Sequence, residues 1–157
     1  MYTRRRELGE LLRARGKEYG ATTGRPRRCG WADTLIIRHA ARVNGMTSVA
    51  ITKLDVLDTF DELKICVGYK YKGKLYEEMP SELAVLDKGT PQYITMPGWK
   101  QTTIGVRNYD DLPKKARSYV EKLCKLCGVK PAVISTGARR DETIILEQPF
   151  KKTGNKR

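Results

Sequence analysis

The stretch Thr52-Lys53-Leu54-Asp55 combines residue types that could recognise a purine base. A carboxylate fixed in a loop can accept two parallel hydrogen bonds, and guanine presents two neighbouring N–H donors in one plane. Adenine offers no such pair on that edge. The aliphatic stem of Lys53 can lie over a flat base while its ammonium stays in water. We therefore predict guanine recognition by Lys53 and Asp55, and the alternative is that both are ordinary solvated loop charges.

The element that must position these residues is a strand. Val49 and Ile51 are β-branched and apolar, and Gly45 ends the preceding element just before them. This pattern predicts a buried strand. A second short strand, 132–137, ends in Ser135-Thr136-Gly137, where a backbone amide could meet the O6 acceptor of guanine. Open α/β sheets bind ligands at the carboxyl ends of their strands, so the two strand ends could read two edges of one base.

A loop rich in glycine and arginine, 20–31, is the second candidate for ligand binding. The guanidinium of arginine presents a planar fork of donors that matches carboxylate and phosphate, and glycine allows a ligand close to the backbone. We interpret the loop as an anion-binding site. The alternative is nucleic-acid binding through Arg25, Arg27 and Arg28, with Trp31 as a stacking partner.

The residues after this loop favour the small anion. Asp33 is a plausible helix cap, and an apolar helix is expected from Thr34 to Val43, ending at Asn44-Gly45. The arginines would then lie on a tightly anchored turn, which suits one small ligand better than a polymer backbone.

The remaining pattern predicts an α/β chain with few other candidates for chemistry. We expect a helix over 7–19, a projecting β-hairpin (64–71 and 75–79), an irregular region over 80–105, a helix from Pro113 to Gly128 and a closing strand over 141–146. The Cys124-x-x-Cys127 pair lies in the predicted helix, and Cys29 and Cys66 supply no matching second pair. We therefore expect all four cysteines to be buried reduced thiols and no zinc site.

Length and charge bound the possible functions. The 157 residues suffice for one domain, and the net charge of +13 is typical of nucleic-acid-binding proteins. However, residues 1–28 and 151–157 hold ten of the thirteen net charges. We expect one domain over 1–150 and a basic, disordered tail over 151–157. With no apolar run that could span a bilayer, we expect a cytoplasmic location and no membrane partner.

Five segments together resemble adenylosuccinate synthetase: 20–31, 52–58, 96–99 (Met-Pro-Gly-Trp), 135–137 and 140–144. They occur in the order found in that family, over about Leu8 to Phe150. The resemblance covers the C-terminal part of the family's chain. The glycine-rich Gly-Asp-Glu-Gly-Lys-Gly phosphate loop and the catalytic Asp and His of the family's N-terminal part have no match here, so we expect no catalytic residue in this chain.

The resemblance implies the C-terminal half of a phosphate-loop NTPase-like mixed sheet, flanked by helices and carrying the β-hairpin appendage. It implies a GTP-dependent ligase that joins L-aspartate to IMP in AMP biosynthesis, with Mg²⁺ as a cofactor whose ligands lie outside this chain, and a homodimer. The implied aspartate and IMP site is Ala21, Thr22, Thr23, Gly24, Arg25, Pro26 and Arg27. The implied GTP site is Arg27, Lys53, Leu54, Asp55, Ser135, Thr136 and Gly137.

The sequence departs from the family after Ser135-Thr136-Gly137. The family usually has proline and an acidic residue there, whereas Ala138 and Arg139 follow here. We expect the chain alone to be inactive, to bind nucleotide weakly, and either to aggregate or to pair with a complementary N-terminal piece. The alternative function is a non-catalytic basic module that binds nucleotides or RNA.

Overall fold

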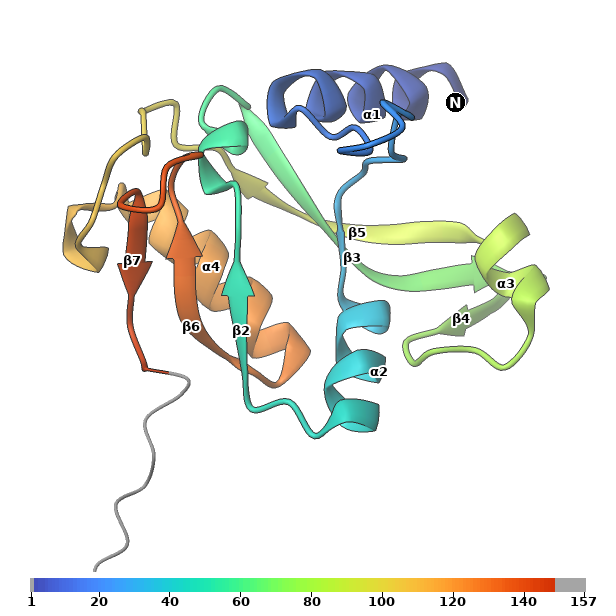
Figure 1. Ribbon diagram of the computed structural model, residues 1–157. Coiled ribbons are helices and arrows are strands. Elements are labelled where there is room, and N and C mark those ends of the chain that lie inside the picture. Colours follow the sequence, from blue (N-terminus) through green and yellow to red (C-terminus); the bar gives the residue numbers. More distant parts are fainter. Residues whose placement is uncertain (1, 149–157) are drawn as a thin grey trace, which may run out of the picture.

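A computed structural model describes residues 2–148, with side chains from residue 7 onward, and shows a mixed α/β fold with two sheets (Figure 1). The predicted α/β class is therefore confirmed. The predicted disordered tail, 151–157, lies outside the described residues. The elements are α1 (Tyr2–Gly16), β1 (Ala32–Asp33), α2 (Thr34–Asn44), β2 (Ser48–Ile51), the 3₁₀ helix η1 (Leu54–Leu57), β3 (Glu62–Tyr71), β4 (Lys74–Tyr76), α3 (Leu83–Lys88), β5 (Thr90–Pro97), the 3₁₀ helix η2 (Tyr109–Asp111), α4 (Lys114–Cys127), β6 (Lys130–Ser135) and β7 (Thr143–Ile145).

The smaller sheet contains both strands that the sequence assigns to a ligand site. Its three strands have the order β2-β6-β7. β2 and β6 are parallel and pair Ile51 with Ile134, whereas β7 is antiparallel to β6. Among the described residues β2 has a neighbour on one side only, and its Ala50 is exposed. The prediction of a strand at 48–51 is confirmed, but the strand is only half-buried because it forms an edge.

The larger sheet is organised around β3, which pairs in parallel with β1 and antiparallel with β4 and β5. The β3–β4 turn, Lys72-Gly73, has φ angles of 46° and 80°, as a tight two-residue hairpin requires. The predicted hairpin is thus confirmed, and it extends away from the smaller sheet together with β5 and α3 (Figure 1).

The prediction that residues 80–105 are irregular is wrong. This region contains α3 and β5, and β5 pairs with β3 along eight residue pairs. Pro91 and Pro97 lie within β5 without breaking it, because β5 is an edge strand bonded only to β3 among the described strands. Proline lacks an N–H and is tolerated in a sheet at such an edge.

The caps of α2 agree with the sequence. The Asp33 carboxylate accepts hydrogen bonds from the amides of Leu35 and Ile36, and Gly45 ends the helix in the left-handed conformation at φ 62°. These groups satisfy amides and carbonyls that a helix leaves unpaired at its ends. The anchored turn before α2 is therefore confirmed. The first helix differs slightly, because α1 ends at Gly16 and not at Tyr19.

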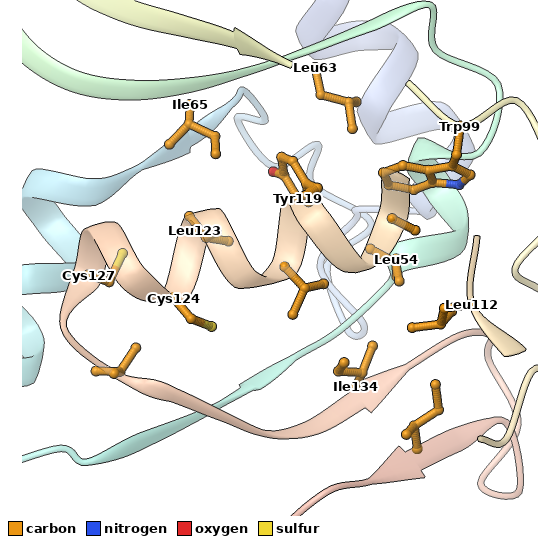
Figure 2. Packing of buried hydrophobic residues seen from close by; sticks show 14 of the residues in the cluster. Leu54, Leu63, Ile65, Trp99, Leu112, Tyr119, Leu123, Cys124, Cys127 and Ile134 are labelled. Atoms are coloured by element: carbon orange, nitrogen blue, oxygen red, sulfur yellow. The ribbon is translucent and has the colours of Figure 1, made fainter. Parts of the chain in front are cut away.

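The core lies on both sides of α4. Tyr119, Leu123 and Cys127 come from this helix, with Leu63 of β3 on one side and Ile134 of β6 on the other (Figure 2). Gly128, in the left-handed conformation at φ 69°, ends α4 and returns the chain into β6. Packing of both sheets against one helix fixes the carboxyl end of β6 relative to the rest of the fold.

Candidate functional site

The carboxyl ends of β2 and β6 lie side by side, because the two strands are parallel and Ile51 pairs with Ile134. Thr52–Asp55 and Ser135–Gly137 therefore leave the sheet at the same edge. The chain turns after β2 at Lys53, whose backbone is left-handed at φ 61°, and enters η1. This geometry brings together the two strand ends predicted from sequence, at the edge where α/β sheets bind ligands.

Asp55 is the half-buried carboxylate of this edge. Its Oδ1 atom is buried and has no hydrogen-bond partner among the described residues. Burial raises the pKa of Asp55 above its ordinary value, and the nearby charges of Asp58 and Glu142 raise it further, whereas a hydrogen bond from the backbone of Asp55 itself and the charge of Lys53 lower it. Asp55 also lines a cavity of about 480 Å³ together with Lys100 and Thr102. A buried acceptor without a partner is costly, so this oxygen is suited to a donor from a ligand.

The turn after β6 is closed by its own hydrogen bonds. The Ser135 hydroxyl donates to the Gly137 carbonyl at 2.9 Å, and the Thr136 amide donates to the Glu142 carbonyl at 2.9 Å. The Thr136 hydroxyl donates to the Val106 carbonyl at 2.8 Å. The Thr136 amide is therefore occupied, so a backbone donor to a ligand at this turn would have to come from Gly137 or the next residue.

Arg139 carries a positive charge where the resembling family usually has an acidic residue, and neighbouring carboxylates pair with it. Its guanidinium donates to both carboxylate oxygens of Asp141, at 3.1 and 3.2 Å, and its amide donates to Glu142 Oε2 at 2.8 Å. Arg107 pairs with the same Asp141. The departure from the family pattern thus adds a cation whose charge is directed at Asp141.

The arginine-rich loop is a compact exposed turn. A bridge pairs Tyr19 with Pro26, and the Gly20 amide donates to the Arg25 carbonyl at 2.9 Å. Gly24 takes a left-handed backbone at φ 64°. No hydrogen bond or ion pair engages the Arg25 guanidinium among the described residues, and it is exposed. The turn therefore presents Arg25 to solvent on a backbone that is already ordered.

Arg27 and Lys53 are held by one carboxylate, that of Glu18. Arg27 Nη1 lies 3.0 Å from Glu18 Oε2, and Lys53 Nζ lies 2.5 Å from Glu18 Oε1. The hydrogen bond from Lys53 lowers the pKa of Glu18 most. The charge of Lys53 and the contact with Arg27 lower it further. All three residues line a cavity of about 440 Å³ that also contacts Arg28. The arginine-rich loop and the end of β2 therefore meet at this cavity.

Glu18 is the residue that the sequence interpretation did not single out. A signal for it exists, because Glu18 is the only acidic residue between Glu10 and Asp33, in a stretch with six basic residues. One acid among many cations is expected to find a partner. The pattern could not have shown that it has two partners from different elements.

The predicted site residues fall into three groups. Arg27, Lys53 and Leu54 line the first cavity, and Asp55 lines the second. Leu54 is 1% exposed and contributes to the core as well. Thr136 of the turn at 135–137 bonds to Glu142, whose charge acts on Asp55, so this turn belongs with the second group. The exposed part of the arginine loop, 21–25, forms the third group. The guanine and anion residues are thus adjacent but do not face one closed pocket.

The cysteines are free thiols. Cys66, Cys124 and Cys127 are buried, whereas Cys29 is only half-buried, unlike the buried thiol expected there. Burial raises the pKa of Cys127 to about 11. Within residues 2–148 no group of three or more His, Cys, Asp or Glu side chains could hold a metal ion. The described residues therefore offer no carboxylate cluster that would hold Mg²⁺ without the phosphates of a ligand. No helix in the same range is long and apolar enough to cross a membrane.

The fold and the polar side chains at the ends of β2 and β6 define an α/β protein with a candidate ligand site at the edge of a parallel strand pair. A family model described as adenylosuccinate synthetase matches residues 1–144. This chain belongs to the adenylosuccinate synthetase family.

Individual relatives agree with this assignment. Adenylosuccinate synthetase from Syntrophomonas wolfei is 55% identical over 137 residues, which are 87% of this chain and 32% of the relative. The enzyme of that name from Geobacter metallireducens is 56% identical over 142 residues, 90% of this chain and 33% of the relative. The solved structure of fully ligated adenylosuccinate synthetase from Plasmodium falciparum superimposes with a TM-score of 0.83 at 34% identity, over 88% of this chain and 34% of that chain. This chain spans about a third of the length of these relatives.

Proposed function

We propose that this chain supplies the guanine-binding and aspartate- and IMP-binding part of a GTP-dependent adenylosuccinate synthetase. The reaction of the assembled enzyme is IMP + L-aspartate + GTP → adenylosuccinate + GDP + phosphate. The observation that carries the proposal is the Asp55 carboxylate at the shared end of β2 and β6, whose buried Oδ1 has no partner in the described part of the chain. Guanine offers two neighbouring donors to such a carboxylate, whereas adenine offers a single donor beside an acceptor.

The proposed roles divide the site residues into a set that binds the base and a set that binds anions. Asp55 accepts from the base, the stem of Lys53 covers it, and the backbone at 135–137 borders it. Thr23, Arg25 and Arg27, on the ordered turn, bind the carboxylates of aspartate and the phosphates of IMP and GTP. Arginine suits both because its donors match planar carboxylate and phosphate oxygens.

We further propose that a second polypeptide segment, carrying the phosphate loop and the catalytic groups, completes the enzyme. The sequence has no Gly-x-x-x-x-Gly-Lys-Ser/Thr loop, and phosphoryl transfer needs the donor phosphates cradled and a metal held across them. Mg²⁺ would neutralise phosphate charge, with ligands from that segment. The chain alone would then bind ligands without turnover, and the assembled enzyme would form a homodimer.

Two features support such a segment. β2 has a free edge among the described strands, and beside it lies an apolar cavity of about 390 Å³ bordered by Ile36, Met46 and Val49. Ile36 is 51% exposed and Met46 36% exposed. The relatives are about three times as long as this chain, so they contain residues enough to cover this face. An exposed strand edge otherwise invites association with another strand.

The second candidate is a basic module that binds RNA. The net charge of +13 and the exposed arginines of the loop favour it. Calorimetric titration with GTP, ATP and an RNA oligonucleotide at two salt concentrations separates the two functions. The synthetase proposal predicts at least tenfold tighter binding of GTP than of ATP. Affinity for RNA that does not depend on base and falls steeply with salt would support the module instead.

A further inference from the structure

Glu18 is placed to connect the two halves of the candidate site. Its carboxylate accepts from Arg27 on the arginine loop and from Lys53 at the end of β2, one oxygen for each cation. The Glu18 side chain is 24% exposed, whereas those of Arg27 and Lys53 are 60% and 45% exposed. The acid is therefore the least exposed member of the three and the one that both cations share.

The backbone fixes Glu18 on both sides. Its amide donates to the Arg13 carbonyl at 2.9 Å, at the end of α1, and its carbonyl accepts from the Arg27 amide at 3.0 Å. Lys53 Nζ also donates to the Gly16 carbonyl at 2.5 Å. The carboxylate thus has a defined position before any ligand binds, and a group held in advance loses little conformational entropy on binding.

Removal of the Glu18 charge would release both cations. Arg27 and Lys53 carry like charges that would then repel each other. Lys53 lies two residues before Asp55, and its charge already acts on that carboxylate. A released Lys53 could turn toward Asp55 and compete with the base for the carboxylate. Binding of anions in general would not weaken, because the net positive charge of the site would increase.

We propose that Glu18 is a positioning residue that holds Arg27 and Lys53 in place, so that the anion loop and the guanine-binding strand end act as one site. This inference rests on the proposed function. Glu18 acts through the two cations and does not itself contact the base. It therefore contributes to the preference for guanine, and its contribution depends on Lys53.

The test compares the affinities of GTP and ATP for the wild-type chain, Glu18→Gln, Lys53→Met and the double variant, by calorimetry. Glu82→Gln is the matched control, because Glu82 is exposed and makes no side-chain cap bond at α3. We expect Glu18→Gln to weaken GTP binding about tenfold and ATP binding much less. In the Lys53→Met background it should weaken GTP binding no more than about twofold, since coupled residues are not additive.

Equal effects of Glu18→Gln with and without Lys53 would overturn the inference, because a merely structural loss would add to the loss from Lys53. Unchanged GTP affinity in Glu18→Gln would overturn it too. If Glu18→Gln did not fold, Glu18→Asp would replace it, and this shorter carboxylate should bind GTP with intermediate affinity. Wild-type affinity equal for GTP and ATP would overturn both the proposed function and this inference, whereas the other outcomes affect only the role of Glu18.

Discussion

The Asp58 carboxylate accepts a hydrogen bond from the indole Nε1 of Trp99 at 2.7 Å, and both groups are buried. The same carboxylate accepts from the amide and the hydroxyl of Thr103, at 2.7 and 2.8 Å. Trp99 packs against Tyr119 of the core helix α4 at 6.0 Å between ring centroids (Figure 2). Trp99, the last residue of the segment 96–99, thus anchors the segment that begins at Lys53.

Substitution of Asp58 by alanine should destabilise the fold strongly. It leaves the Trp99 indole and the Thr103 amide buried without an acceptor, a loss of about 3 kcal/mol. For a chain of this size that corresponds to a Tm lower by roughly 6–12 °C. Thermal unfolding followed by circular dichroism measures it.

Asp61→Ala is the control for Asp58. Asp61 pairs with Lys100 at the surface, where its side chain is 80% exposed, so its removal should cost less than about 1 kcal/mol. A similar loss of Tm in both variants would contradict the anchoring role of Asp58.

Gly98 lets two segments approach closely. Its amide donates to the Asp61 carbonyl at 2.7 Å, and a Cβ at Gly98 would lie 1.8 Å from the Phe60 carbonyl oxygen. Gly98→Ala should therefore cost about 1–3 kcal/mol through forced backbone movement. Gly30→Ala, where a Cβ would meet no atom within 4 Å, should change the free energy of unfolding by less than about 0.5 kcal/mol. Equal urea midpoints for the two variants would argue against this close contact.

Asp55 should make GTP binding dependent on pH. Burial raises its pKa, so the carboxylate is protonated at a higher pH than an ordinary aspartate with a pKa of about 3.9. Protonation removes an acceptor, and GTP affinity should therefore fall as the pH is lowered through the raised pKa. Asp55→Asn should lack this pH dependence and should bind GTP about ten- to a hundredfold more weakly at pH 7. An identical pH profile in wild type and Asp55→Asn would refute the assignment.

Arg25 should matter for ligands and not for stability. Its guanidinium is exposed and lacks a partner among the described residues, so Arg25→Lys should leave the Tm within about 1 °C. The lysine cannot reproduce a two-donor contact, and binding of aspartate should weaken. Arg42→Lys, near the end of α2, is a control that should bind aspartate as the wild type does. Unfolding of Arg25→Lys would instead make the loop structural.

Glu18 should add stability at neutral pH that is lost in acid. Because Lys53 and Arg27 lower its pKa, the ionised form is favoured in the folded state. The stabilisation from Glu18 is fully present above the unfolded-state pKa of about 4.3. It disappears as the pH falls through the lowered folded-state pKa. Chemical unfolding between pH 7 and 3 should show a smaller acid-induced loss in Glu18→Gln than in the wild type. A loss of the same size in both would show that the two ion pairs add nothing.

The sequence predicts local features of this fold well. The cap of α2 follows from Asp33, its end from Gly45, and the hairpin from Gly73, because each signal acts within a few residues. The rule that α/β sheets bind ligands at the carboxyl ends of their strands predicted that the ends of β2 and β6 could serve one ligand. That the two strands are parallel neighbours is seen only in the structure.

The features that the sequence could not predict depend on distant partners. Pro91 and Pro97 argued against a strand at β5. They are compatible with the strand only because it lies at an edge of the sheet. The half-burial of β2 depends on the absence of a second neighbouring strand among the described residues. Glu18 belongs to the site only because the fold brings the end of α1, the arginine loop and the end of β2 together.

The most direct test of the central claim is a map of backbone amide chemical shifts on addition of GTP to the isotopically labelled chain. We predict the largest changes at Lys53–Asp55 and at Gly137 and Ala138, with smaller changes in the arginine loop, and much weaker changes at the same sites with ATP. Changes confined to the β3–β4 hairpin, or equal changes with GTP and ATP, would contradict a guanine site at the shared end of β2 and β6.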